Sequence, residues 1–418
     1  MRLLKHTAAH VEAARDAAHV RRLNLERVLA AAIAHEGEFT RAELVKNTGL
    51  SPPTVGSLSS TLIRLGILND LGAGPSRGGR RPGRMQFNAN YAFVAGIDIG
   101  PTRTRLGLAD LRGELLARRV VPTPRDADPQ TLLRSMAHEI ADLSREAELA
   151  RDRLLAVAVG VPGIVDPNTG MLVGLTPNLK GWAGAPVGAI LTREIGVAAV
   201  VENDVNLAIL GEHWKGAARG HDTCVFLTFG TGIGAGIMMN GQLYHGHHFL
   251  AGEIGLMCMG PQYVDKDFGS RGCLETLSGL GALRAKWNPE GADSPDWVAE
   301  LFRAAENGDD LARQTVDDAA TVLGIAAANV CCVLDPSLVV LGGALAVQAA
   351  PLVERVRQLI SKFIFRPPPI VVSSLDKDAP LWGSLLLATS AARERLRERL
   401  RQQLGPDRDA ALTAAASR

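Results

Sequence analysis

The sequence predicts a small, basic α+β module followed by a much larger α/β body built from two similar lobes. Residues 1–90 carry 13 Lys and Arg against 7 Asp and Glu, and the rest of the chain is mildly acidic. Capped helices and two short strands are predicted between residues 40 and 87. From Tyr91 onward, apolar strands alternate with amphipathic helices, and a glycine-rich run stands at 230–236.

The chain of 418 residues is too long for one ordinary domain. We expect a helical extension at 1–20, the basic module at 21–88, the α/β body at 91–400 and a flexible tail at 401–418. The five cysteines are scattered and include no CxxC pair, which favours a reducing compartment. No apolar signal core opens the chain, and the apolar run 154–165 is too short to span a bilayer. A soluble, cytoplasmic protein without a membrane partner is expected.

Three helices are predicted in the basic module. Apolar residues recur at helical spacing from Leu23 to Ile33, and Gly37 is expected to end that helix. Thr40 and Glu43 form the pattern of a capping box for the second helix, which should end at Gly49. Ser51 is a good N-cap for the third, because the proline that follows it needs no N–H at the first helical position.

The third helix has one apolar face and one face of small polar residues. Its apolar residues are Val55, Leu58, Leu62 and Leu65, and its polar face is expected to carry Thr54, Ser57, Thr61 and Arg64. Small hydroxyl residues let a helix approach a DNA major groove and can bond phosphates or base edges. The pattern predicts a helix-turn-helix. The alternative is a capped amphipathic helix in a small bundle.

A glycine-rich basic loop follows the third helix. A strand is predicted to begin at 66–68 and another at 85–87, and the arginines between them suit phosphate contacts or minor-groove insertion. We expect this loop to be a wing, so that the module is a winged helix-turn-helix, and to serve also as the link to the body. The candidate DNA-contacting residues are Arg41, Ser51, Thr54, Ser57, Thr61, Arg64, Arg77, Arg80, Arg81 and Arg84.

The body is predicted to contain two similar sets of elements. In the first set a strand at 92–99 ends in Asp98-Ile99-Gly100, and further strands, a helix at 132–150 and a buried strand at 154–161 follow. A second set begins at Thr223 and includes a hairpin turn at Asn240-Gly241. Two such sets suggest duplicated lobes around a cleft.

Seven motifs in one order carry a resemblance to a known family. They include Asp98-Ile99-Gly100, Glu202-Asn203-Asp204 and Ala251-Gly252-Glu253, and the full set lies at 98–100, 177–182, 201–206, 230–236, 251–255, 272–275 and 341–345. Residues 20–400 resemble the ROK family, which joins sugar-responsive repressors to bacterial sugar kinases. The added basic module is similar to the repressor branch. The resemblance implies an actin/hexokinase-type, ribonuclease-H-like fold for the body.

The resemblance also assigns roles to residues. Asp204 matches the base of the kinases, and a sugar kinase needs such a carboxylate and a backbone cradle for ATP. The residues implied to bind the effector sugar are Asn178, Asn203, Asp204, Glu253 and Glu275. The residues implied for a vestigial nucleotide site are Asp98, Gly100, Thr102, Gly230, Thr231, Gly232 and Gly234.

Two departures from the family pattern concern nucleotide and metal. Pro101 replaces a glycine of the first phosphate loop and removes an N–H, so ATP binding should be weakened or lost unless the proline is tolerated. Of the family's zinc ligands only Cys273 remains, because Leu256, Lys266 and Phe268 stand at the other places. The alternative is a zinc site rebuilt from His245, His247, His248 and Cys258. We expect neither metal nor cofactor.

These features favour a DNA-binding regulator, most simply a repressor of carbohydrate genes, that acts as a homodimer or higher homo-oligomer on a double-stranded operator. A sugar would bind in the cleft without being phosphorylated, and Leu256 would suit an effector with fewer hydroxyls or another orientation. The cleft could instead be unliganded, but buried carboxylates without partners would be costly. An active kinase with a DNA-binding module and a constitutive regulator with a decayed sensor are the alternatives.

Overall fold

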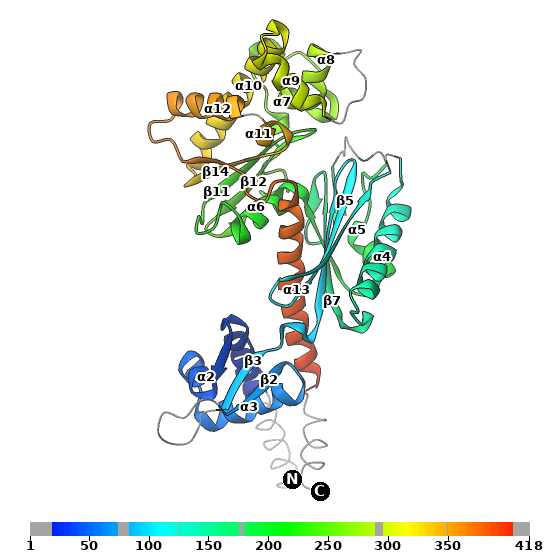
Figure 1. Ribbon diagram of the computed structural model, residues 1–418, viewed down its shortest axis with the longest axis vertical. Coiled ribbons are helices and arrows are strands. Elements are labelled where there is room, and N and C mark those ends of the chain that lie inside the picture. The colour runs from blue at the N-terminus through cyan, green and yellow to red at the C-terminus, as the bar shows by residue number, and fades with distance from the viewer. Residues whose placement is uncertain are drawn as a thin grey trace, which may run out of the picture.

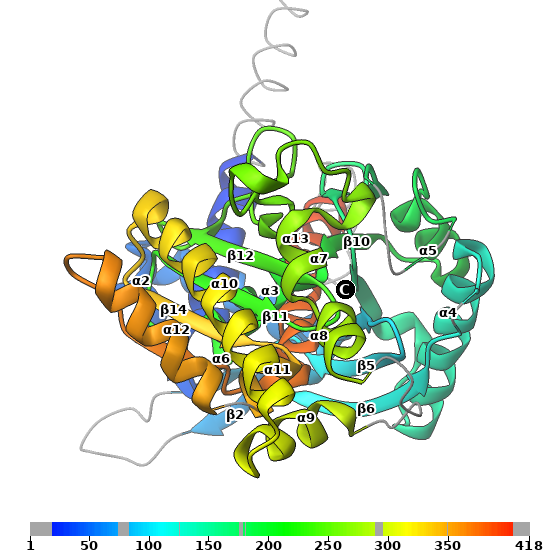
Figure 2. The ribbon, with the colours of Figure 1, turned by 90° about the horizontal axis from the view of Figure 1, so that it is seen from above.

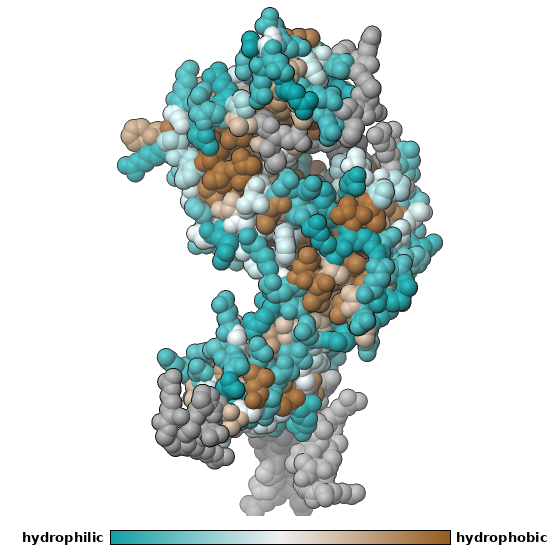
Figure 3. All heavy atoms as spheres, in the orientation of Figure 1, coloured by the Kyte–Doolittle hydropathy of each residue, from teal (hydrophilic) through white to brown (hydrophobic). Residues whose placement is uncertain are grey.

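The computed structural model describes residues 19–73, 83–124, 126–174, 179, 181–288, 296–348 and 350–403. The N-terminal module lies at one end of the molecule, and the two-lobed body lies at the other (Figure 1). In the space-filling view the module projects from the body and is joined to it by a narrower waist (Figure 3). Four predicted site residues, Asn178, Arg77, Arg80 and Arg81, lie outside the described residues, as do 1–18 and 404–418.

The N-terminal module consists of a helix over residues 19–34, two further helices and a three-stranded antiparallel sheet of order β1-β3-β2. The elements are β1 (Glu38–Thr40), α2 (Arg41–Thr48), α3 (Pro52–Arg64), β2 (Leu68–Ala73) and β3 (Gly83–Phe87). The predicted caps are confirmed. Thr40 and Glu43 form the reciprocal capping box, the Ser51 side chain accepts from Thr54 N, and Gly49 ends α2 at φ 67°. The first helix ends before Gly37, which lies in the turn ahead of β1.

The first lobe is built on a five-stranded sheet of order β10-β7-β4-β5-β6. Its strands are β4 (Phe93–Ile99), β5 (Arg103–Asp110), β6 (Leu115–Pro122), β7 (Leu154–Val161) and β10 (Ala199–Asn203), with a small separate pair β8 (Val165–Asp166) and β9 (Met171–Leu172). Its helices are α4 (Pro129–Glu146) and α5 (Val187–Ile195), with 3-10 turns η1 (Ala89–Tyr91) and η2 (Arg151–Arg153).

The second lobe repeats this plan with a sheet of order β13-β12-β11-β14-β15. Its strands are β11 (Cys224–Phe229), β12 (Ile233–Met239), β13 (Gln242–Leu243), β14 (Leu338–Gly342) and β15 (Ile370–Val372). Its helices are α6 (Asp204–Lys215), α7 (Cys273–Ser278), α8 (Leu280–Trp287), α9 (Trp297–Glu306), α10 (Asp310–Leu334), α11 (Ala344–Gln348) and α12 (Ala350–Phe363). Its 3-10 turns are η3 (Ile254–Leu256), η4 (Pro261–Tyr263), η5 (Gly269–Arg271) and η6 (Asp376–Asp378).

The two sheets have the same topology, which confirms the predicted pair of similar lobes. The first strand of each lobe, β4 or β11, pairs antiparallel with the next strand of the chain and parallel with the strand that follows a helical crossover. Helices α4 and α5 cover the outer face of the first sheet, and α10 and α12 cover that of the second (Figure 2). Helix α6 and the long helix α13 (Ala379–Gln403) pack on the inner faces and against each other.

Helix α10 is the one helix of the described chain that is long and apolar enough, by length and composition, to cross a membrane. Its inner face packs into the core of the second lobe. The buried residues of that face include Ala320, Leu323, Ala327, Val330 and Cys331, which share one hydrophobic cluster with β11 and β14.

Helix α13 joins the body to the N-terminal module. It begins beside the interlobe cleft, crosses α6, packs on β4 and β7 and reaches the first helix of the module (Figure 1). Leu396 and Leu400 are buried in the same hydrophobic cluster as Leu25 and Val28. Residues 401–403, the start of the expected tail, belong to α13, and Arg401 pairs with Glu26.

Candidate effector cleft and DNA-binding surface

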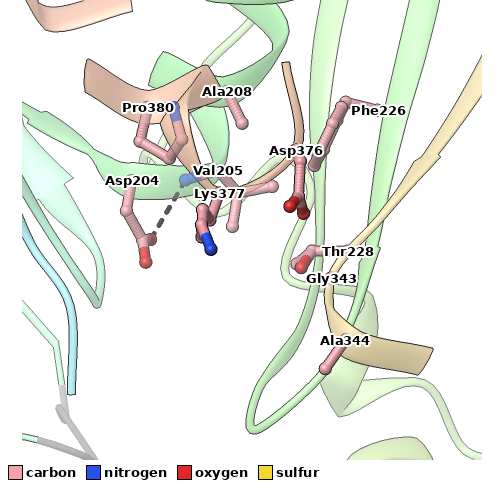
Figure 4. Close-up of a pocket in the computed structure, with 10 residues that line it drawn as sticks. All are labelled: Asp204, Val205, Ala208, Phe226, Thr228, Gly343, Ala344, Asp376, Lys377 and Pro380. Carbon is pink, nitrogen blue, oxygen red and sulfur yellow. Dashed lines mark hydrogen bonds between the residues drawn. The ribbon is translucent and has the colours of Figure 1, made fainter. Parts of the chain in front are cut away.

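A cleft of about 580 Å³ lies between the two lobes and brings most of the predicted site residues together. Its lining includes Gly100, Pro101, Thr102, Asn203, Asp204, Gly230, Thr231, Gly232, Gly234, Glu253, Leu256 and Glu275. An adjoining hollow of about 310 Å³ is lined by Thr228, Gly343 and Ala344 of the second lobe (Figure 4). Asp204 and Lys377 line both cavities. All the effector and nucleotide residues inferred from the sequence line this cleft except Asp98, which is buried beside it, and Asn178, which lies outside the described residues.

The junction of β10 and α6 places Asn203 and Asp204 in the cleft. Asn203 is the N-cap of α6, and its Oδ1 accepts from the backbone N of Val205 and Asn206 at 2.8 and 3.0 Å. Its Nδ2 donates to the carbonyl of Gly163 at 3.0 Å, so one amide hydrogen remains for a ligand. The Asp204 carboxylate accepts from Val205 N at 3.0 Å and keeps its other oxygen toward the cleft.

Four carboxyl groups of the cleft have raised pKa values. Burial is the main cause in each case, and it raises the pKa of Asp204 to about 6 and that of Asp98 and Glu253 to about 7. The negative charge of Asp204 adds to the rise at Asp98 and Glu253. The pKa of Glu275 is also raised by burial, although its Oε2 accepts from Ile233 N at 3.1 Å.

Carboxyl groups in this state suit a ligand rich in hydroxyls. A carboxyl near its pKa can donate as well as accept a hydrogen bond, and each sugar hydroxyl does both. A neutral polyol would also supply hydrogen bonds to the buried carboxyl groups, which water reaches poorly. A small polar ligand rich in hydroxyls therefore suits these carboxyl groups, and the same cleft is also lined by Arg103, Arg105, Arg271 and Lys377.

The first phosphate loop is altered at more than Pro101. The Gly100 N–H donates to the carbonyl of Arg103 at 3.1 Å, so the loop already uses the donor next to the proline. Arg105 Nη1 lies 3.4 Å from Asp98 Oδ2, and its Nε lies 3.5 Å from Asp378 Oδ1 at the start of α13. The Arg105 guanidinium is therefore the cationic neighbour of Asp98. No motif in the sequence indicated this role for Arg105.

The second phosphate loop keeps more of its donors. Gly230 N donates to Gly232 O at 3.2 Å and closes the turn between β11 and β12. Among the hydrogen bonds found within the described chain, none uses the N–H of Thr231 or Gly232. These two groups remain able to contact an anion or a hydroxyl in the cleft.

A side-chain pair beside the site, with one buried and one half-buried member, was not predicted from the sequence. His245 Nε2 lies 2.7 Å from Glu202 Oε2, and the side chain of Glu202 is 4% exposed. The hydrogen bond to Glu202 raises the pKa of His245. The two residues are distant in sequence, so only the position of Glu202 next to Asn203 could have hinted at the pair.

The histidines do not gather into a metal site. Within the described ranges, no group of three or more His, Cys, Asp or Glu side chains is arranged to hold a metal ion. His247 and His248 are exposed and contact each other edge to face, and the Cys258 thiol donates to the carbonyl of Gly260. The rebuilt zinc site considered from the sequence has no support in this geometry.

The candidate DNA surface holds most of its predicted residues, with one correction. Ser51, Ser57, Arg41 and Arg64 are exposed, as are parts of Thr54 and Arg84. Thr61 is 4% exposed and donates to the carbonyl of Ser57 at 3.1 Å. It lies three residues after Leu58 and therefore flanks the buried stripe of α3 instead of the polar face.

Two of the basic residues of the module are held by polar partners. Arg41 Nε donates to the hydroxyl of Ser59 at 3.1 Å, across from α2 to α3. Arg84 Nη1 donates to Glu38 Oε2 at 2.6 Å, across the β1-β3 pair. Both contacts fix the position of a guanidinium on the surface of the module, where a phosphate could be bound.

The sequence model of the ROK family matches residues 94–391. The chain belongs to the ROK family. The match covers both lobes of the cleft and ends inside α13. As a ROK protein, the chain is similar to a xylose repressor of Caldicellulosiruptor bescii, at 28% identity over 368 residues, with 84% of this chain and 92% of that protein covered. It is also similar to a glucokinase of Thermotoga maritima, at 30% identity over 324 residues, with 72% and 98% covered.

The solved ROK structures that match this chain also include both a regulator and sugar kinases. A ROK family transcriptional regulator, described as a homologue of the E. coli MLC protein, matches 91% of this chain and 98% of its own with a TM-score of 0.73 and 23% identity. The ROK hexokinase of Thermus thermophilus matches 72% of this chain and 99% of its own with a TM-score of 0.62 and 32% identity. The matches to regulators thus extend over more of this chain than the matches to kinases.

Proposed function

We propose that this ROK protein is a DNA-binding transcriptional regulator, and specifically a repressor of carbohydrate genes, controlled by a sugar that it binds without phosphorylating. The observation that carries the proposal is the fusion, through α13, of a basic three-helix module to a cleft whose first phosphate loop is altered. The similarity to xylose repressors over most of the chain supports it.

The order of elements in the N-terminal module supports a winged helix-turn-helix. A short turn at Gly49 joins α2 to α3, and the β2–β3 hairpin stands beside them in the position of a wing. The exposed residues of α3 would enter the major groove, and Arg41 and Arg84 would contact phosphates. A symmetric operator would be bound by two copies of the chain.

The cleft would hold a neutral monosaccharide. Asp204, Glu253 and Glu275 supply hydroxyl-binding carboxyls, and Leu256 lines the same cleft with 51% of its surface exposed. An apolar side chain there lowers the number of hydroxyls that the site can pair. This favours a pentose or a deoxy sugar over a fully hydroxylated hexose.

Phosphoryl transfer is disfavoured by the first phosphate loop. Pro101 removes one N–H, Gly100 uses another within the loop, and Arg105 pairs with Asp98. A nucleotide would have to displace this arrangement. The alternative of an active kinase rests on the second loop, whose Thr231 and Gly232 donors remain, and on the glucokinase relative.

The path from cleft to DNA would run through α6 and α13. Helix α6 starts at Asp204 in the cleft and packs closely along α13, which ends against the N-terminal module. Closure of the lobes on a sugar would shift α13 and with it the module. For such coupling the sugar must bind the two states with different affinities.

A thermal-shift screen with D-xylose, D-glucose, other monosaccharides and ATP tests the proposal. We expect one sugar to stabilise the protein, Asp204→Ala to abolish that shift, and the same sugar to change the affinity for a promoter fragment of the protein's own gene. ATP-dependent turnover of a sugar that is abolished in Asp204→Asn would establish the kinase instead. The absence of any shift would favour the decayed sensor.

A further inference from the structure

We propose that Glu202 and His245 form a positioning pair that aligns the two halves of the effector site, one from each lobe. Through this pair, the segment that carries Asn203 and Asp204 is held in a fixed position relative to the loop that carries Glu253. Neither residue needs to touch the ligand. This inference rests on the proposed sugar site and adds the residues that hold it in shape.

Glu202 organises the first half of the site. Its Oε1 accepts from the backbone N of Asn203 at 2.8 Å and from Nδ2 of Asn206 at 2.9 Å. Both partners belong to the first turn of α6, where Asn203 is the cap. The orientation of Asn203 and Asp204 toward the cleft therefore depends on where the carboxylate of Glu202 is held.

His245 organises the second half. It follows β13 in the second lobe, and its carbonyl accepts from Ala251 N at 3.1 Å, two residues before Glu253. The loop between them is tightly constrained. Phe249 has φ 61°, and a Cβ at Gly252 would come within 1.9 Å of the carbonyl of Ala235.

The backbone N of Ala235 donates to the carbonyl of Gly252 at 2.7 Å and fixes the loop on β12, and the ring of His245 ties the start of the loop to Glu202. Phe249, Ala251 and Glu253 line a small recess together with Asn203. The bond from His245 to Glu202 is the described side-chain contact that ties this loop to the end of β10. A buried carboxylate that keeps its hydrogen-bond donors is held in place, because losing a donor would leave a buried oxygen without a partner.

The loss of the pair should therefore loosen the loop and misplace Glu253 without unfolding the lobes. In His245→Ala the Oε2 of Glu202 loses its donor, while Oε1 keeps its bonds to Asn203 and Asn206, and the segment 244–253 loses its side-chain tie to the end of β10. In His245→Gln an amide hydrogen can still reach Glu202, so this variant should restore part of the alignment. His247→Ala is the matched control, because His247 lies exposed on the same loop.

Hydrogen exchange of the full-length protein without ligand is the first measurement. We expect faster exchange at 250–254 in His245→Ala, with β7 and α10 unchanged, partial recovery in His245→Gln and no change in His247→Ala. Equal exchange in wild type and His245→Ala would overturn the proposal. If His245→Ala does not fold, the comparison is made between Glu202→Gln and wild type, with the same two outcomes.

The second measurement is the affinity for D-xylose and D-glucose by calorimetry. Whichever sugar binds wild type should bind His245→Ala about tenfold more weakly, as expected when a buried carboxylate loses a hydrogen-bond donor, and the loss of affinity should be smaller in His245→Gln. Unchanged affinity in His245→Ala would refute the positioning role. If neither sugar binds wild type, the proposed sugar site fails for these ligands, and the exchange measurement alone decides the role of the pair.

Discussion

Arg401 donates two hydrogen bonds to Glu26, from Nε to Oε1 at 2.6 Å and from Nη2 to Oε2 at 3.0 Å. The contact joins the last described turn of α13 to the first helix of the N-terminal module. Because the opposite end of α13 begins beside Lys377 in the cleft, one continuous helix connects the cleft to the N-terminal module. A rigid connection of this kind can transmit a lobe movement that a loose linker would lose.

The first prediction concerns that contact. Arg401→Ala should leave thermal stability almost unchanged, because the pair is partly exposed and screened by solvent. The change in DNA affinity caused by the effector sugar should shrink, because the module is held less firmly. DNA binding is measured by fluorescence anisotropy with and without the sugar. Arg399→Ala, an exposed arginine of the same helix, is the control. An unaltered sugar effect in Arg401→Ala would exclude this route.

The second prediction concerns the crossing of α6 and α13. A Cβ at Gly383 would lie 2.0 Å from the carbonyl of Leu207, and one at Gly211 would lie 2.2 Å from that of Ala379. Gly383→Ala should therefore lower the free energy of unfolding by about 1–3 kcal/mol, the usual cost of overpacking. Urea unfolding measures this.

The control for the crossing is Gly281→Ala in α8, where no atom lies within 4 Å of the added methyl. That change should be neutral or stabilise the protein by up to about 1 kcal/mol, because alanine is the better helix former. If Gly383→Ala proved as stable as Gly281→Ala, helices α6 and α13 would have to be less closely packed than they are in the structure.

Local signals in the sequence were enough to predict the helix caps and strands of the fold, and family motifs predicted many residues that line the cleft. The capping box at Thr40, the Ser51 cap and the repeated strand pattern all depend on near neighbours along the chain, and the structure confirms them. The common position of Asp204 and Glu253 followed from family motifs rather than from spacing alone. The structure places both in one cleft.

What the sequence could not reveal depends on contacts between distant segments. Glu202 with His245, Arg105 with Asp378 and Glu26 with Arg401 are side-chain pairs that only the packed lobes bring together. No periodicity marks such partners. Thr61 was misplaced for a related reason, since helical spacing alone does not show how wide the buried stripe of α3 is.

The third prediction concerns pH. Asp98 and Glu253 have pKa values raised to about 7, and Asp204 to about 6, so the folded protein holds protons that the unfolded chain has released. The stabilisation is complete below the ordinary carboxyl pKa and is lost as pH rises through the folded values. The raised pKa of His245 acts in the same direction above its ordinary value. Stability should therefore fall between about pH 5 and pH 8.

Differential scanning calorimetry of the ligand-free protein across this range measures the fall. Each extra proton bound by the folded state lowers the free energy of unfolding by about 1.4 kcal/mol for every pH unit of increase. Glu253→Gln removes one such group and should flatten the dependence. Glu43→Gln is the comparison, because the pKa of Glu43 is lowered and its titration lies below the window. A pH dependence as steep in Glu253→Gln as in wild type would show that Glu253 is ionised throughout.

The fourth prediction separates two neighbouring residues of α3. Arg64 is exposed, and its Nη2 donates to the hydroxyl of Thr61 at 3.4 Å, whereas Thr61 itself is buried. If Arg64 contacts a phosphate, Arg64→Ala should weaken binding to a mixed-sequence duplex and lower the slope of log affinity against log salt by about 1. Thr61→Ala should leave that slope unchanged and instead lower the free energy of unfolding by about 1 kcal/mol, because it removes a hydrogen bond from the buried Thr61 to Ser57.

Anisotropy titrations over about 50–300 mM salt distinguish the two variants, since only a lost phosphate contact changes the number of released counterions. An unchanged slope in Arg64→Ala would place the DNA on another face of the module, and a lower slope in Thr61→Ala would mean that α3 rearranges when it binds.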